Sequence, residues 1–194
     1  RLKGNHISAL FIDSEDRVWI GHSGKGITLV EDGEFVELNL GFDFTPRCFV
    51  EDQDGFIWVG TEGRGVIRYN VTSKRVIRMY SVEDGGLMAN LINQVAVDSF
   101  NNIYVGTNKG LDVFFSEAGR FYSYTASSGF VGIETKPNAS IVDRSGNMWF
   151  GTVEGVTRYR PSINAQVPGE PSTYITGMQV NHEPVSMVDG LKLS

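Results

Sequence analysis

The sequence is poor in the residues that build most catalytic and metal centres. Its 194 residues include one cysteine, Cys48, and three histidines. A single cysteine excludes an internal disulfide and any metal site built from several cysteines. The histidines, His6, His22 and His182, show neither a pair at metal-ligand spacing nor a zinc signature. We therefore expect no catalytic residue, metal or cofactor in this chain, and we expect it not to be an enzyme.

Basic residues and long apolar runs are also scarce. The chain has 17 Lys and Arg against 23 Asp and Glu, a formal net charge of -6. Nucleic-acid binding needs clustered basic residues to replace counterions, so DNA and RNA are excluded as partners. No stretch approaches the roughly 18 consecutive apolar residues of a membrane span, and no leader is recognisable. We expect no membrane contact by this chain, and we expect it to be part of a longer protein.

Glycine, by contrast, is abundant, with 23 residues, and the chain contains a fourfold repeat. The repeats start at Leu10, Cys48, Val95 and Ser140 and superimpose without a gap. Three positions recur: an aspartate (Asp13, Asp52, Asp98, Asp143), an aromatic residue (Trp19, Trp58, Tyr104, Trp149) and a glycine (Gly21, Gly60, Gly106, Gly151). The glycine follows the aspartate by 8 residues in every repeat, whereas successive aspartates are 39, 46 and 45 residues apart. The length changes therefore fall in the connecting loops.

Each repeat predicts short antiparallel strands. An apolar run is followed by a turn, a second strand that ends at the aromatic residue and glycine, and a third strand. A fourth strand is predicted in three repeats, over Glu34–Leu40, Arg75–Tyr80 and Arg120–Tyr124. Four short strands in about 40 to 50 residues is the period of a β-propeller blade. We predict an all-β fold of four four-stranded antiparallel blades over residues 1–160, a fragment of a larger propeller.

The recurring residues have structural explanations. An aspartate before a turn accepts backbone N–H groups, and the aromatic residue fills space between blades. Residues 52–55 resemble the start of a calcium loop but lack the later ligands. Residues 21–26 match neither a nucleophile elbow nor a phosphate loop.

Polar loops on one face of the propeller are the candidate ligand site. In a propeller, the loop entering each innermost strand and the loop between the second and third strands open on the same face, and such loops commonly carry function. They contain Asn5, His6, Lys25 and Asn108, and the residues that we predict to bind a ligand are Arg47, Arg64, Glu62, His22, Asn90, Lys109, Asn138 and Glu154. Arg47 and Arg64 belong to one blade and could form a fork for a carboxylate. Glu62 and Glu154 occupy equivalent loops and could instead converge as paired carboxylates.

Two blocks resemble a known repeat. Residues 51–61, EDQDGFIWVGT, followed by residues 65–69, GVIRY, are similar to the two-component regulator propeller repeat. The resemblance covers about residues 5–160, with His22 in place of Thr in the first repeat and Tyr104 in place of Trp in the third. The tail, residues 173–194, resembles the opening strands of the three-tyrosine (Y_Y_Y) β-sandwich module, after a linker over residues 161–172.

The resemblance implies an extracytoplasmic sensor. Such propellers form the periplasmic part of inner-membrane regulators in Bacteroides-like bacteria, with a histidine kinase, hybrid kinase or diguanylate cyclase as output in domains outside this chain. Their ligand is a small polar molecule such as an oligosaccharide. Two alternatives stay open: a non-catalytic scaffold for protein contacts, and a propeller lyase or hydrolase, which should show a converging histidine and carboxylate set.

Four repeats are expected to form an open arc rather than a closed ring. The fourth repeat is followed by Arg160-Pro161, a strand-breaking position, and no outer strand is predicted after it. The apolar faces of the first and last blades, including Ala9–Ile12 and the side of Trp149, would then be exposed. We therefore expect self-association through blade faces.

Overall fold

The computed structural model describes residues 2–125, 130, 132–161, 178–180 and 183–185. Within these residues all of the regular secondary structure is β-strand, which confirms the predicted all-β class. The strands form three sheets of four strands, one sheet of three strands and one two-stranded hairpin, all antiparallel.

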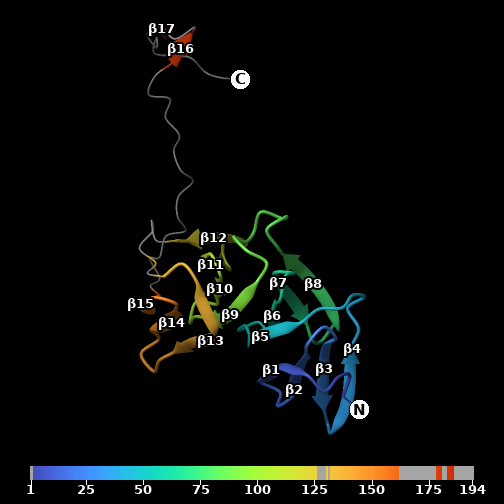
Figure 1. Cartoon of the computed structure of the whole chain (residues 1–194). Helices are drawn as coiled ribbons and strands as arrows, with labels where there is room; N and C mark the ends of the chain where they lie inside the picture. The colour runs from blue at the N-terminus through green and yellow to red at the C-terminus, as the bar shows by residue number, and fades with distance from the viewer. Residues whose placement is uncertain (1, 126–129, 131, 162–177, 181–182, 186–194) are drawn as a thin grey trace.

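Each repeat folds into one blade whose strands pair in chain order (Figure 1). Blade 1 contains β1 (Ile7–Ile12), β2 (Val18–His22), β3 (Gly26–Glu31) and β4 (Glu34–Leu38). Blade 2 contains β5 (Pro46–Glu51), β6 (Phe56–Thr61), β7 (Val66–Asn70) and β8 (Arg75–Tyr80). Blade 3 contains β9 (Ile92–Val97), β10 (Ile103–Thr107), β11 (Gly110–Phe115) and β12 (Arg120–Tyr124). Blade 4 contains β13 (Thr135–Val142), β14 (Met148–Thr152) and β15 (Gly155–Tyr159), and the hairpin consists of β16 (Met178–Val180) and β17 (Glu183–Val185).

The observed strand bounds lie close to those that the sequence pattern predicts. The outer strands predicted over Arg75–Tyr80 and Arg120–Tyr124 coincide with β8 and β12, and only β4 ends two residues before the predicted Leu40. Blade 4 has no outer strand among the described residues, as its sequence indicates. The hairpin β16–β17 lies within the segment predicted to begin a sandwich module. Almost all of the predicted linker lies outside the described residues, so the linker and the module stay predictions.

The four blades follow one another around an arc (Figure 1). Their inner strands pack side by side, β1 against β5, β5 against β9, and β9 against β13. Three hydrophobic clusters fill the three junctions, one between each pair of neighbouring blades. Trp19 lies in the first cluster, Trp58 in the second and Tyr104 in the third. In blades 1 to 3 the recurring aromatic residue therefore fills the junction with the next blade, as predicted.

The recurring glycine has a steric reason. A Cβ at Gly60 would meet the Ile92 side chain of the next blade and Cys48 on the neighbouring strand of its own blade. Close packing of inner strands thus leaves no room for a side chain at position 60.

Cys48 itself is buried, and burial raises the pKa of its thiol to about 12.

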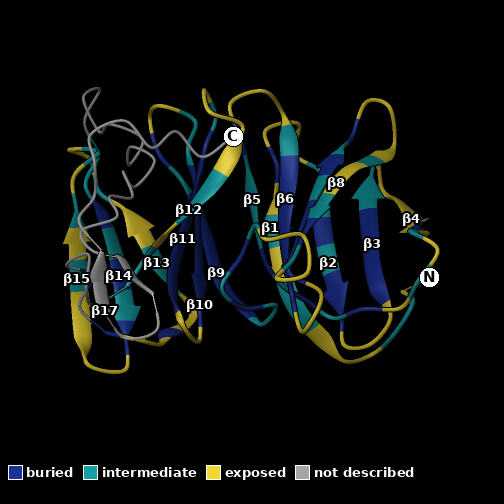
Figure 2. Cartoon of the chain, turned by 90° about the horizontal axis from the view of Figure 1, so that it is seen from above, coloured by how far each residue is buried: buried dark blue, intermediate teal, exposed yellow. Residues whose placement is uncertain are grey.

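The arc is open at both ends. The close packing that joins neighbouring inner strands is not repeated between β13 and β1 in the described part of the chain. As Figure 2 shows, the second and third strands of blades 1 to 3 are largely buried, whereas β15 is largely exposed. Leu10 on β1 is 68% exposed and Ile141 on β13 is 67% exposed. The prediction that Ala9–Ile12 would lack cover holds for Leu10 and Ile12, while Phe11 packs against blade 2.

Candidate functional site

The recurring aspartate joins the first turn of each blade to the aromatic side chain of its second strand. In blade 2, one carboxylate oxygen of Asp52 accepts the backbone N–H groups of Asp54 and Phe56 at 3.0 and 2.9 Å. Its other oxygen accepts the indole N–H of Trp58 at 2.7 Å. The turn role predicted for the aspartate is confirmed, and the bond to the aromatic residue is additional.

The same bond recurs in all four blades. Trp19 donates to Asp13 at 2.7 Å, Trp149 donates to Asp143 at 2.9 Å, and the Tyr104 hydroxyl donates to Asp98 at 2.9 Å. Tyrosine can replace tryptophan in blade 3 because its hydroxyl supplies the same donor. These eight recurring residues, four aspartates and four aromatic residues, are therefore structural.

Hydrogen bonds to the ionised form hold two of these carboxyls charged. Trp149 and Asn147 donate to Asp143 and lower its pKa to about 2. At Asp13, burial acts to raise the pKa, but the bonds from Trp19 and Arg17 outweigh it and the net shift is downward.

An open cavity lies where the inner strands of blades 1, 2 and 4 approach one another. Its volume is about 390 Å³, and its lining is mainly polar. The lining residues are His6, Ile7, Ser8, Ser23, Thr45, Arg47, Glu62, Pro137 and Asn138. Three of the predicted ligand-binding residues, Arg47, Glu62 and Asn138, thus come together from two different blades.

Arg47 is held in place by a chain of bonds that crosses three blades. Its Nε donates to the Ile92 carbonyl at 3.0 Å and its Nη2 to the Asn93 side-chain oxygen at 3.3 Å. Asn93 then donates to the carbonyl of Thr135 at 2.7 Å, and the Thr135 hydroxyl donates to the Thr107 carbonyl at 3.0 Å. We call Arg47, Asn93 and Thr135 the polar belt. A guanidinium has five N–H groups, so the belt leaves donors of Arg47 free to meet a ligand.

Glu62 supplies the opposite charge in the same cavity. Its backbone N–H donates to the Thr45 carbonyl at 2.9 Å, and the residue pairs with Leu91 in an isolated β-bridge, so its position is fixed by the main chain. The side chain is exposed. Donors on Arg47 and acceptors on Glu62 therefore face one opening.

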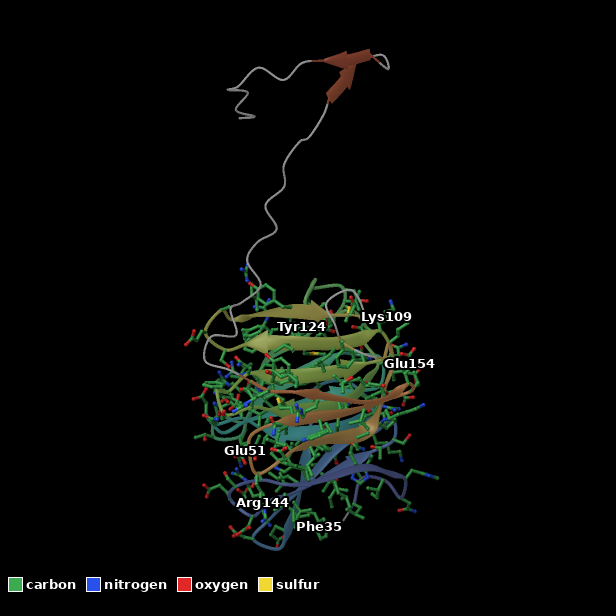
Figure 3. The ribbon with its side chains drawn as sticks, turned by 90° about the vertical axis from the view of Figure 1, so that its left-hand side faces the viewer. Phe35, Glu51, Lys109, Tyr124, Arg144 and Glu154 are labelled. Atoms are coloured by element: carbon green, nitrogen blue, oxygen red, sulfur yellow. The ribbon has the colours of Figure 1, made fainter. Side chains whose placement is uncertain are left out.

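The other predicted residues lie elsewhere. Arg64 stacks over the Phe42 ring at 4.9 Å, so it does not form a fork with Arg47. Asn90 clamps its own loop, accepting the Val82 N–H at 2.8 Å and donating to Glu83 at 2.9 Å. Lys109 and Glu154 are exposed at one edge of the blades (Figure 3), and neither lines the cavity. Glu62 and Glu154 therefore do not share this cavity as a carboxylate pair.

His22 is not on the ligand-accessible surface. It is completely buried, and its Nε2 lies 2.9 Å from the Thr28 hydroxyl. In the other blades a threonine stands at this position and bonds the carbonyl that closes the hairpin, as Thr61 does to Gly65 at 2.7 Å. Burial lowers the pKa of His22, Lys3 and Lys25 lower it further, and only the Gly4 backbone opposes this. Sequence reasoning placed His22 in a surface loop because burial at a blade end is invisible in a local pattern.

The lowered pKa predicts that acid destabilises blade 1. The unfolded chain takes up a proton at His22 near the ordinary pKa of 6.5. In the folded chain His22 is protonated only at a lower pH. The free energy of unfolding should therefore fall as pH drops below about 6.5, by at most about 1.4 kcal/mol per pH unit from this group. The variant H22T should lose this contribution.

The measurement is urea unfolding of both proteins at about pH 5, where an exposed histidine is charged, and at about pH 7.5, where it is neutral. All other titrating groups are common to the two proteins, so the difference between them isolates His22. Equal pH dependence in the two proteins would contradict the prediction.

A buried acid that the sequence analysis did not single out is Asp112 on β11. Burial raises its pKa, while bonds from the Ser123 hydroxyl and the Met88 N–H lower it. Met88 donates at 3.0 Å, and Ser123 also donates to this carboxyl. Both oxygens are engaged, so Asp112 holds the loop before blade 3 and is not placed to react.

No group of three or more His, Cys, Asp or Glu residues is suitably placed for a metal ion in the described ranges. Among the same residues, no helix is long and apolar enough to cross a membrane.

Known proteins share this architecture. The two-component regulator propeller family matches residues 1–24 and 40–63. A curated relative, histidine kinase P4 of Formosa agariphila, is 26% identical over 95% of this chain, which spans 14% of the relative. An extracellular domain assigned to a hybrid two component system of B. thetaiotaomicron has a TM-score of 0.64 and 19% identity, with 81% of this chain and 22% of that chain covered. Virginiamycin B lyase of Staphylococcus aureus, in a catalytically inactive form, has a TM-score of 0.63 and 19% identity, with 84% and 59% covered.

The fold defines an arc of four β-propeller blades. Within that class, residues 1–24 of blade 1 and residues 40–63, which reach into blade 2, are similar to the two-component regulator propeller, in agreement with the sequence resemblance.

Proposed function

We propose that this chain is part of the extracytoplasmic sensing region of a bacterial two-component regulator, and that its cavity binds a small polar ligand such as an oligosaccharide. The observation that carries the proposal is Arg47, fixed by the polar belt with donors to spare, beside Glu62 in an open cavity.

The comparisons support the sensing role. Propeller repeats of this family are present in the chain, and a domain with a similar fold is extracellular in its own protein. The curated relative is a histidine kinase of which this chain matches only a small part. Kinase output therefore belongs to domains other than this one, and the propeller supplies recognition.

The chemistry of the cavity suits a polyhydroxylated ligand. Sugar hydroxyls both donate and accept hydrogen bonds, and the lining offers both functions, with Arg47 as donor, Glu62 as acceptor and Ser8, Ser23 and Thr45 as hydroxyls. A carboxylate on the sugar would gain a charge-assisted bond to Arg47. We therefore expect acidic oligosaccharides to bind more tightly than neutral ones of the same length.

The test is isothermal titration of the chain with matched acidic and neutral oligosaccharides. Glu62→Gln removes the charged acceptor and leaves the polar belt intact, so it should raise Kd about tenfold for a neutral oligosaccharide. The rise should be smaller for an acidic one, because the variant also loses the repulsion between Glu62 and the sugar carboxylate. Lys109→Gln, an equally exposed change outside the cavity, should leave Kd unchanged. Binding of a neutral oligosaccharide that is indifferent to Glu62→Gln would place the ligand elsewhere.

The same samples separate the alternatives. Analysis of the sugar after incubation should show no cleavage. Turnover that is lost in Glu62→Gln would instead favour a lyase or hydrolase, in which His6, a histidine that lines this cavity, would be the candidate partner of Glu62. No binding by any of the sugars would favour the scaffold function.

A further inference from the structure

The innermost strands of blades 1 to 3 carry a bulge at the same position of the repeat. The pairing with the second strand omits Ser8 in β1, Arg47 in β5 and Asn93 in β9. Each of these residues stands five positions before the recurring aspartate, and the residue after it pairs with the recurring glycine. An extra residue in one strand interrupts the ladder and re-aims its side chain. The bulge therefore releases one side chain per blade from the sheet.

The side chains at this position are all polar, and most of them line the cavity. Ser8 and Arg47 are part of the lining, and so is Asn138, which holds the same position in blade 4. Asn93 is buried and bonds to Arg47, so it supports a lining residue. We call Ser8, Arg47, Asn93 and Asn138 the bulge residues. The framework fixes where they stand, while their identity differs between blades.

The bulge of blade 4 is longer than the others. Thr135 pairs with Thr152, and a Cβ at Gly151 would lie 2.8 Å from the Cβ of Ala139. Thr135 precedes its aspartate by 8 residues, whereas the equivalent residues of the other blades precede theirs by 6. Residues 136–138 therefore stand where a single residue stands elsewhere, and all three are exposed. The longer bulge brings residues 137 and 138 into the cavity lining.

The backbone of Asn138 is in an unfavourable conformation. Its φ is 52, in the left-handed region that residues other than glycine adopt at a cost. It lies inside β13, whereas the other described non-glycine residues with positive φ lie between strands: Asp16, Asp32, Lys74 and Asn101. Its side chain is exposed and makes no hydrogen bond within the described part of the chain that would offset this cost. Strain of this kind clusters at ligand sites.

We propose that the bulge residues are the positions at which this propeller selects its ligand, and that Asn138 binds two neighbouring hydroxyls of an acidic sugar whose carboxylate meets Arg47. This inference rests on the proposed function and names the groups that the cavity recognises. The asparagine amide has a donor and an acceptor side by side, which matches a pair of adjacent hydroxyls. Arg47 and Asn138 belong to blades 2 and 4, so a ligand held by both spans the cavity.

Asn138→Gly tests this inference without disturbing the fold. Glycine adopts a positive φ without strain, so the melting temperature should not fall and should rise by up to about 3 °C. The variant loses the hydrogen bonds from the amide to the sugar, so Kd for an oligogalacturonate should rise about tenfold. Each unit of that sugar carries a carboxylate and an adjacent pair of hydroxyls. The measurements are thermal unfolding without ligand and isothermal titration with oligogalacturonates and with neutral galacto-oligosaccharides of the same length.

Asp32→Gly is the matched control. Asp32 also has φ 52 and is exposed, but it lies between β3 and β4 and does not line the cavity. The melting temperature should change in the same direction as in Asn138→Gly, because the same strain is relieved. Kd for both sugars should stay at the original value.

Asn138→Asp separates the chemistry of the side chain from its shape. Aspartate adopts this backbone conformation at Asp16 and Asp32 in the same chain, so the bulge should be kept. A carboxylate cannot donate a hydrogen bond, and it repels the carboxylate of an acidic sugar. Kd should therefore rise more for oligogalacturonates than for the neutral sugars.

The possible outcomes distinguish this inference from the proposed function. If Asn138→Gly binds both sugars as the original protein does, while Glu62→Gln weakens binding of the neutral sugar, the inference is wrong and the proposed function stands. A melting temperature that falls in Asn138→Gly would assign the side chain to the fold and would also overturn the inference. No binding of either sugar by the original protein would overturn both.

Discussion

Replacing Asp52 with alanine should lower the free energy of unfolding by at least about 3 kcal/mol. The change leaves the N–H groups of Phe56 and Trp58, and that of the exposed Asp54, without their acceptor, and each buried donor left unsatisfied costs about 1–3 kcal/mol. The indole of Trp58 is 1% exposed and cannot turn to water. Arg68 also loses its ion pair with the Asp52 carboxylate, which is 3.5 Å away.

Two variants calibrate this result in urea unfolding. Asp52→Asn keeps one oxygen for the backbone but presents an NH₂ group to the indole N–H, so it should lose about half as much stability. Asp43→Ala, a change at an exposed acid, should stay within about 0.5 kcal/mol of the original protein. If Asp52→Ala were no worse than Asp43→Ala, the anchoring role would be wrong.

Gly65→Ala should be as damaging, for a steric reason. Gly65 has φ +71, and a Cβ there would collide with the backbone carbonyl of Tyr80 on the neighbouring strand. Backbone cannot move aside as a flexible side chain does. We expect a loss of at least about 3 kcal/mol in the free energy of unfolding.

Gly63 supplies a matched control two residues away. It has φ +84, and no atom lies within 4 Å of the position that a Cβ would occupy. Both glycines donate to the Asn90 carbonyl at 3.0 Å. Gly63→Ala should therefore cost only the strain of a positive φ, about 1 kcal/mol. Thermal and urea unfolding of the pair separate steric collision from backbone strain, and equal losses would exclude the collision.

The repeat pattern predicts the fold far better than it predicts the site. Strands such as β8 and β12 follow from alternation and turn residues because both signals are local. The bond from Trp58 to Asp52 joins residues only six apart, yet a composition argument cannot show that the side chains meet. The presence of Tyr104 where the other repeats have Trp could have indicated this bond, since both side chains are aromatic and carry a hydrogen-bond donor.

The site depends on contacts between distant segments. Arg47 was predicted to face a ligand and does line the cavity, but its bonds to Ile92 and Asn93 join residues 45 and 46 positions apart. Arg64 belongs to the same blade and points to Phe42 instead. Loop membership identifies which face a residue belongs to, while the direction of its side chain is set by neighbours that sequence spacing does not reveal.

The bond between the aspartate and the aromatic residue also bears on how such a chain can change over generations. Because this bond closes entirely within one blade, a duplicated or deleted blade carries its own internal support with it. The contacts to the neighbouring blades are mainly apolar and are made by equivalent positions, so a newly inserted unit meets a surface that it already fits. Modular inheritance of this kind lets the number of blades vary, while the residues that line the cavity diverge independently of the framework.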